Sequence, residues 1–224
     1  MQTFEKDGKK LIYVPIDIEV ELPSEEELLA YHNEHHVLNT DYEDYIDNRH
    51  IYTMCATRYK LDDWRIWPNS LHNDKKGWKT PVDDYELLWN VDFKEKFPSL
   101  VKLILELPFK QVAGAAFLYQ IGAYKPHFDS ADQNFPMEPR RYNVLLTSPE
   151  RNTFYMGDND NRHYPEVDPK YPCFAFNNTD VTHGTEQPTG LKIVMGIMGI
   201  LDDEKHEALI KRSVEKFPDK AIWL

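Results

Sequence analysis

The chain has 224 residues, of which 41% are hydrophobic and 29% charged, and its formal net charge is -12 at pH 7. This length supports one sizeable core, and the composition is that of a globular protein, so we expect a single domain over residues 1–224. The acidic surface repels phosphate backbones and anionic lipids, which argues against nucleic-acid or membrane partners.

The first residues and the cysteines indicate the compartment. Residues 1–10 mix charges with Gly8 and contain no apolar run, so we expect neither a secretory signal nor a membrane anchor there. The two cysteines, Cys55 and Cys173, are far apart and have apolar or aromatic neighbours, which favours buried reduced thiols over a disulfide or a zinc site. These features predict a cytoplasmic protein.

The N-terminal part of the chain predicts one strand and one helix. Residues 11–20 are rich in β-branched side chains, and Pro15 within them indicates an edge strand or two short strands. Ser24 followed by Glu27 forms a capping-box pattern before an apolar run, which predicts a helix over residues 24–35.

Residues 38–92 are less regular, with one predicted strand at 51–59 and long loops rich in aromatic side chains. These rings either pack the loops onto the core or line a substrate pocket, and both interpretations remain open.

The second half of the chain is dominated by predicted strands. A helix begins at Pro98 and ends at Pro108, and Asp202 or Asp203 caps a last helix that reaches Phe217. Between these helices we predict strands over residues 112–121, 141–147, 152–156, 172–177 and 191–201. This order predicts a mainly β fold, an antiparallel double-sheet barrel of jelly-roll type with flanking helices.

A candidate metal site follows the strand at 112–121. In a strand, residues two apart point to the same face, so His127 and Asp129 can reach one ion while Phe128 turns into the opposite layer. His183 follows a later aromatic strand and can complete a set of two imidazoles and one carboxylate. That set is typical of non-haem Fe(II) oxygenases, because it leaves positions open for a bidentate co-substrate and dioxygen.

Two cations accompany the predicted ligands. Arg141 begins the strand after the motif, and Lys192 lies nine residues beyond His183. Both flank apolar runs, where an unpaired charge is costly, so each is expected to have an anionic partner. Spacing alone leaves two interpretations open, an anionic co-substrate or a structural ion pair with an acidic residue.

Two sets of residues resemble known Fe(II)- and 2-oxoglutarate-dependent dioxygenases. The run Tyr-Lys-Pro-His-Phe-Asp at 124–129 resembles the Tyr-x-Pro-His-x-Asp signature of prolyl 4-hydroxylase-like enzymes. Residues 141–147, 154–157 and 176–183 resemble three segments of the aspartyl/asparaginyl β-hydroxylase branch in their order. These segments are an Arg-x-His strand, an aromatic-aromatic-x-Gly segment and a Phe-Asp-Asn-x-x-x-His stretch. The similarity spans about residues 112–201 and is more specific for the mechanism than for the substrate.

The resemblance implies a cupin-like double-stranded β-helix with its core at about 112–201, and it assigns roles by position. The implied Fe(II) ligands are His127, Asp129 and His183. The implied 2-oxoglutarate-binding residues are Arg141, Lys192, Tyr124 and Asn143. Asn143 departs from the histidine of Arg-x-His, and Lys192 departs from the arginine usual in the β-hydroxylase branch, although lysine is normal in prolyl hydroxylases.

The predicted function is hydroxylation of an unactivated C–H bond in an amino acid or a peptide-like substrate, with Fe(II), 2-oxoglutarate and dioxygen. Asp129 favours hydroxylation over halogenation, because halogenases that resemble this fold lack the carboxylate so that chloride can bind. Two alternatives remain, a cupin-like metal-dependent isomerase or hydrolase and a non-catalytic barrel that binds a small acid. The sequence does not specify the substrate or the oligomeric state.

Overall fold

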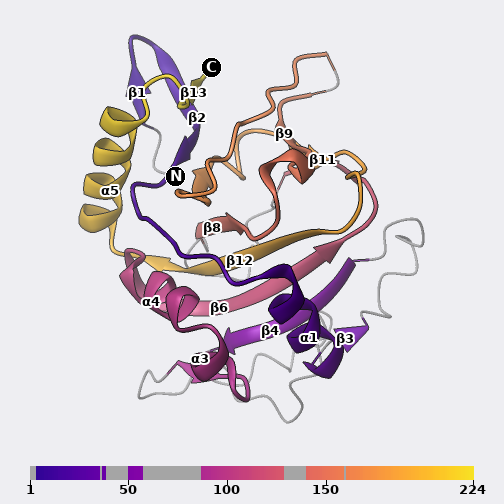
Figure 1. Ribbon diagram of the computed structural model, residues 1–224. Helices are drawn as coiled ribbons and strands as arrows, with labels where there is room; N and C mark the ends of the chain where they lie inside the picture. The colour runs from indigo at the N-terminus through magenta and orange to yellow at the C-terminus, as the bar shows by residue number, and fades with distance from the viewer. Residues whose placement is uncertain (1–3, 36, 39–49, 58–86, 129–139, 159) are drawn as a thin grey trace, which may run out of the picture.

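The computed structural model describes residues 4–35, 37–38, 50–57, 87–128, 140–158 and 160–224. Its strands form two antiparallel sheets (Figure 1). The main sheet has ten strands in the order β1-β2-β10-β8-β12-β6-β4-β3, with β13 paired to β2 and β5 paired to β4. The minor sheet has three strands in the order β7-β11-β9. The mainly β prediction is confirmed, while the described strands do not close into a barrel.

The seven predicted strands are present with changes at their ends, and the other six described strands, β1, β3, β5, β7, β11 and β13, were not predicted. The main-sheet strands are β1 (Glu5–Lys6), β2 (Lys9–Pro15), β3 (Val37–Leu38), β4 (His50–Thr57), β5 (Leu88–Trp89), β6 (Phe109–Gln120), β8 (Arg140–Leu145), β10 (Cys173–Phe176), β12 (Lys192–Leu201) and β13 (Ile222–Trp223). The minor-sheet strands are β7 (Tyr124–His127), β9 (Phe154–Met156) and β11 (His183–Thr185). The predicted loops fall mostly on residues 39–49 and 58–86, which lie outside the described residues, so their role stays a prediction.

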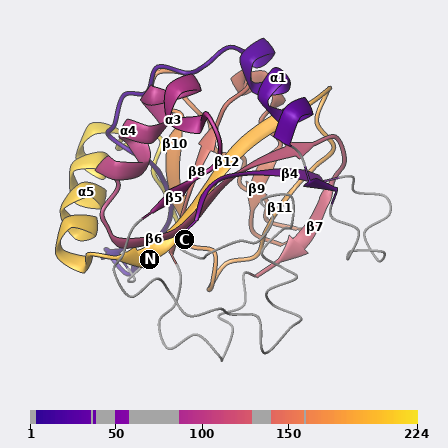
Figure 2. The same cartoon turned by 90° about the horizontal axis from the view of Figure 1, so that it is seen from below.

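The helices cover one face of the main sheet and the minor sheet lies against the other face (Figure 2). They are α1 (Glu25–His35), α3 (Phe93–Lys96), α4 (Pro98–Glu106) and α5 (Asp203–Lys216), with a short 3₁₀ helix at Pro149–Arg151. The capping-box prediction for α1 is confirmed, because the Glu27 amide donates to Ser24 Oγ at 3.2 Å and Glu27 Oε2 accepts from the Ser24 amide at 2.8 Å. The short α3 was not predicted.

Strand β12 shows why the sheet separates two cores. Its side chains alternate between faces, so Ile193, Met195 and Ile197 lie in the large core beneath the helices. Val194 lies in the second core, and both Val194 and Lys192 line a pocket on the opposite face. A strand buried on both faces reads as one continuous apolar run, which is how β12 appears in the sequence.

Strand β2 corrects one prediction. Pro15 predicts an edge strand or two short strands, but β2 pairs with β10 on one side and with β1 and β13 on the other. Pro15 is the last residue of the strand, so its missing amide hydrogen interrupts no interior ladder bond.

Three further findings bear on the sequence predictions. Cys55 and Cys173 are both buried and free, as predicted. Strand β6 begins earlier than predicted, at Phe109, because Phe109 pairs with Leu201 of β12. No helix in the described part of the chain combines the length and the apolar character that crossing a membrane requires.

Candidate active site

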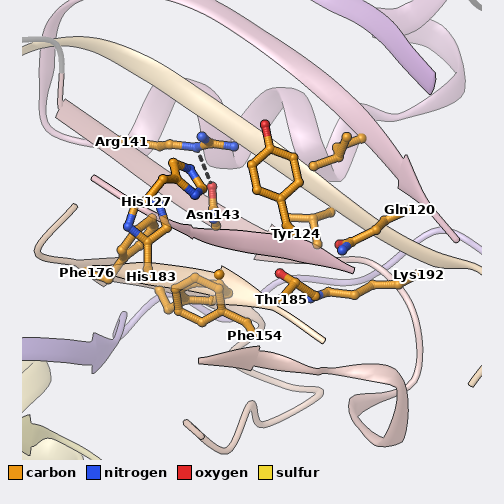
Figure 3. A pocket seen from close by; sticks show the side chains of 14 residues that line it. Gln120, Tyr124, His127, Arg141, Asn143, Phe154, Phe176, His183, Thr185 and Lys192 are labelled. Atoms are coloured by element: carbon orange, nitrogen blue, oxygen red, sulfur yellow. Dashed lines mark hydrogen bonds between the residues drawn. The ribbon is translucent and has the colours of Figure 1, made fainter. Parts of the chain in front are cut away.

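An open pocket lies between the main sheet and the minor sheet, with an empty volume of about 670 Å³ when its solvent-filled mouth is included (Figure 3). Every predicted site residue that the structure describes lines it. The lining residues are Leu118, Gln120, Tyr124, His127, Arg141, Asn143, Phe154, Phe174, Phe176, His183, Gly184, Thr185, Lys192 and Val194.

The minor sheet brings the two predicted histidine ligands together. His127 of β7 and His183 of β11 are direct partners in the antiparallel register, and their ring centroids are 4.4 Å apart. His183 is 4% exposed, and the edge-to-face ring of Phe176 packs on it with centroids 4.9 Å apart. The convergence of two imidazoles that are 56 residues apart in sequence is therefore a property of the fold.

The hydrogen bond of His127 defines which of its ring nitrogens carries the hydrogen. His127 Nδ1 lies 2.9 Å from the carbonyl oxygen of Lys125. A carbonyl only accepts, so Nδ1 carries the hydrogen, and the lone pair of the neutral ring lies on Nε2. A ligating histidine commonly makes this bond with its other nitrogen, which fixes both tautomer and ring orientation.

The donor set fits two of the three positions of a 2-His-1-carboxylate metal site. The third predicted ligand, Asp129, lies outside the described residues and stays a prediction. Within the residues that the structure does describe, no group of three or more His, Cys, Asp or Glu side chains is placed to hold a metal ion.

Lys192 lies at the other end of the pocket, and its described surroundings bear on the two interpretations of its anionic partner, a co-substrate or an acidic residue. The side chain is 2% exposed, and its amine makes no hydrogen bond or salt bridge with any described residue. Burial lowers the pKa of Lys192 from 10.5 to about 7. The sequence could not show that this charge faces a pocket, because the opposite wall comes from β11, which pairs in the other sheet.

Arg141 lies at the histidine end of the pocket (Figure 3). Its Nε donates to Asn143 Oδ1 at 2.8 Å, so two predicted co-substrate residues are bonded to each other. The guanidinium lies over Gly196 of β12, where an added Cβ would be 3.0 Å from Arg141 Nη2. Gly196 is four residues beyond Lys192, roughly 13 Å along the strand, so the two cations occupy opposite ends.

Tyr124 lies in the pocket as predicted, whereas Phe128 does not lie in the layer predicted for it. Tyr124 lines the pocket, and its ring centroid is 4.8 Å from that of His127. Phe128 was expected in the opposite layer but is 53% exposed. Strand β7 ends at His127, so the alternation of strand side chains does not extend to Phe128.

The sequence patterns did not indicate Gln120 or Thr185, although both line the pocket. Thr185 follows His183 by two residues on β11, and that spacing was a usable signal for a shared face. Gln120 is the register partner of Lys192, which only the pairing of β6 with β12 reveals.

Gly184 allows the minor sheet to pack closely beside the pocket. A Cβ at this position would lie 2.5 Å from the Tyr155 hydroxyl and 2.7 Å from the Tyr124 carbonyl oxygen. The backbone of β11 therefore needs glycine between His183 and Thr185.

Comparisons with known proteins leave the family open. No protein-family model and no curated protein sequence matches the chain. The crystal structure of a prolyl-4-hydroxylase from Pseudomonas putida aligns with 85% of this chain and 93% of its own, at 11% identity and a TM-score of 0.40. A non-haem α-ketoglutarate-dependent carbocyclase, SnoK from nogalamycin biosynthesis, aligns with 81% and 85%, at 14% identity and a TM-score of 0.30. Both TM-scores are below 0.5, so neither alignment assigns a function to this chain.

Proposed function

We propose that the protein is a non-haem Fe(II)- and 2-oxoglutarate-dependent dioxygenase that hydroxylates a C–H bond of an amino acid or a peptide-like substrate. The observation that carries the proposal is one pocket with a pair of imidazoles at one end and, at the other, a buried lysine that has no hydrogen-bond or ion-pair partner among the described residues. We also propose that the two sheets are the layers of a distorted jelly-roll barrel.

His127 and His183 would hold the iron, with Asp129 as the carboxylate ligand. Bound Fe(II) with 2-oxoglutarate and dioxygen supplies the oxidising power for cleavage of an unactivated C–H bond. The Lys125 carbonyl oxygen accepts the hydrogen bond from His127 Nδ1, and this bond would keep His127 in the tautomer that binds a metal through Nε2.

Lys192 and Arg141 would hold 2-oxoglutarate. Lys192 is the stronger candidate for the carboxylate remote from the metal, because it lies at the end of the pocket away from the histidines. Arg141 lies near the histidines and is oriented by Asn143, so it is suited to a carboxylate beside the metal. A dicarboxylate that spans the pocket would satisfy both cations at once.

The apolar wall of the pocket has a separate role. Phe154, Phe174 and Phe176 lie on β9 and β10, and Val194 lies on β12, all facing the same space. These side chains would limit the access of water between the cations and the histidines once a ligand is bound, which would strengthen the electrostatic interactions there.

An anaerobic spectroscopic experiment tests the proposal. Fe(II) and 2-oxoglutarate added together to the wild-type protein should give a weak visible charge-transfer band, and succinate should form when oxygen is admitted. His127→Ala and His183→Ala should each abolish the band and reduce succinate release by at least about a hundredfold.

His163→Ala is the matched control, since His163 lies outside the pocket lining and holds β9 through its backbone. The control should retain the band. Absence of a band in pure, folded wild-type protein would refute the proposal, and turnover that needs no oxygen would support a metal-dependent isomerase or hydrolase instead.

A further inference from the structure

The deep end of the pocket is built from three strands around Lys192. Lys192 of β12 lies opposite Gln120 of β6 in the register, and Thr185 of β11 lines the same space. Figure 3 shows the Lys192 side chain reaching toward Thr185, at the end away from His127. The amide of Gln120 is fixed, because its Nε2 donates to the Gly122 carbonyl oxygen at 2.8 Å.

The described residues around Lys192 do not offset a positive charge. The ionisable or charged lining groups are Tyr124 and His127 of β7, His183 of β11 and Arg141 of β8. The described lining residues of β6, β9 and β10 are apolar or amide side chains, and no described lining residue is Asp or Glu. Since no acidic side chain of the described residues lines the pocket, a ligand carboxylate is the anion that we assign to Lys192.

One further ion pair lies next to Lys192 in sequence. Arg151 Nη1 donates to the carbonyl oxygen of Leu191 at 3.1 Å and to Glu25 Oε2 at 2.8 Å. Glu25 is thus already paired with Arg151 and is not among the residues that line the pocket.

Because Lys192 is buried and no described residue pairs with it, the neutral amine is the less costly form in the ligand-free protein. A proton on Lys192 becomes favourable only when a carboxylate compensates it. Ligand and proton should therefore bind together, since each lowers the free energy of binding the other.

We propose that a dicarboxylate enters this pocket together with one proton from solvent, which converts the Lys192 amine to an ammonium ion paired with the ligand. Thr185 Oγ is the neutral donor to the same carboxylate. The inference rests on the proposed function for the identity of the dicarboxylate, 2-oxoglutarate. It adds that co-substrate affinity depends on pH near neutrality through a residue that is not a metal ligand.

Calorimetry measures the proton directly. 2-Oxoglutarate is titrated under nitrogen into protein saturated with Mn(II), from pH 6 to pH 9, in buffers of different ionisation enthalpy. We expect proton uptake close to zero at pH 6 and approaching one proton per ligand at pH 8. Once the pH exceeds about 7 to 7.5, the Kd of 2-oxoglutarate should rise about tenfold for each further pH unit. Uptake near zero at pH 8, or no binding at pH 6, would overturn the inference.

Two controls identify Lys192 as the proton acceptor. Lys192→Arg carries a permanent charge, so 2-oxoglutarate should bind without proton uptake and with a Kd that changes less than twofold between pH 7 and pH 9. Persistent uptake in this variant would mean that the proton goes elsewhere, for example to a metal-bound hydroxide.

A wild-type measurement keeps the test valid if arginine does not fit the pocket. In protein labelled with ¹³C at lysine Cε, the Lys192 resonance should titrate near pH 7 in the empty protein and above pH 8 with 2-oxoglutarate. A midpoint above pH 9 in the empty protein would contradict the inference.

The two proposals fail in different ways. Proton-coupled binding without succinate release would leave the inference standing and refute the dioxygenase. Succinate release without proton uptake would support the dioxygenase and refute the proton-coupled binding.

Discussion

Lys192 connects stability with binding at the scale of one side chain. Its pKa falls from 10.5 to about 7 on folding, so between these values the unfolded chain binds a proton that the folded chain does not. The free energy of unfolding therefore rises with pH from about 7 to about 10.5 through this group, and the penalty is fully present below pH 7. The buried Lys192 therefore lowers the free energy of unfolding at neutral pH, which is the cost of having a cation site in the pocket.

Lys192→Met should separate these two effects. Because methionine fills a similar volume without the amine, the free energy of unfolding should increase by about 1–4 kcal/mol at pH 7. The gain should shrink toward pH 10, and 2-oxoglutarate binding should be lost. Urea unfolding at both pH values measures the change, with the exposed Lys102→Met as a control that stays within about 0.5 kcal/mol. A less stable Lys192→Met at pH 7 would contradict the argument.

Gly196 is the second residue whose role follows from contact geometry. A methyl group there would press on the Arg141 guanidinium, which would have to move away from the 3.0 Å contact. Gly196→Ala should therefore raise the Kd of 2-oxoglutarate about tenfold, because small misplacements of a binding group are costly. The effect should vanish in an Arg141→Met background, where the obstructed group is absent. Equal effects in both backgrounds would show that Gly196 acts on the strand itself.

At the scale of elements, α1 depends on a local signal in the sequence. Ser24 Oγ donates to Glu27 Oε2 at 2.7 Å and accepts from the Glu27 amide at 3.2 Å, which completes a reciprocal cap. Ser24→Ala should lower the free energy of unfolding by about 1 kcal/mol, whereas Ser24→Asn should change it by only a few tenths. Chemical denaturation of the two variants side by side measures the difference, and equal stability would show that packing alone holds α1.

Elements with local signals were predictable from the sequence, and elements defined by distant pairing were not. The cap of α1, the start of α4 at Pro98 and the apolar run of β12 are visible in the chain itself. In contrast, β1 and β13 are two-residue strands that exist only because β2 lies beside them. No periodicity is possible over such a length.

The same distinction holds for the site. His127 and His183 could be predicted as neighbours because both lie at strand ends, and the β7–β11 register brings them into contact. The absence of an acidic side chain beside Lys192 among the described residues could not be predicted, because it depends on which side chains of β6 and β11 surround it. Gln120 was missed for that reason, and Asp129 stays a prediction.

At the scale of the whole molecule, contacts join the N-terminal and C-terminal parts of the chain. Asp17 follows β2 and forms ion pairs with Arg212 and Lys216 of α5, the first with an Nε–Oδ2 distance of 2.9 Å. The backbone atoms of Lys10 and Leu224 also exchange hydrogen bonds at 2.6 and 2.9 Å, and Figure 1 shows β13 beside β2. The N-terminal and C-terminal segments therefore stabilise each other.

This arrangement predicts one cooperative unfolding transition for residues 1–224. Far-UV circular dichroism and tryptophan fluorescence should give the same midpoint in urea, because neither end of the chain has a core of its own. Asp17→Asn should lower the free energy of unfolding by about 1 kcal/mol and shift both signals equally. Glu207→Gln, which removes an exposed pair with Lys211 within α5, should shift them by less than half as much. Two separate midpoints, or a shift confined to one signal, would instead divide the chain into units that unfold independently.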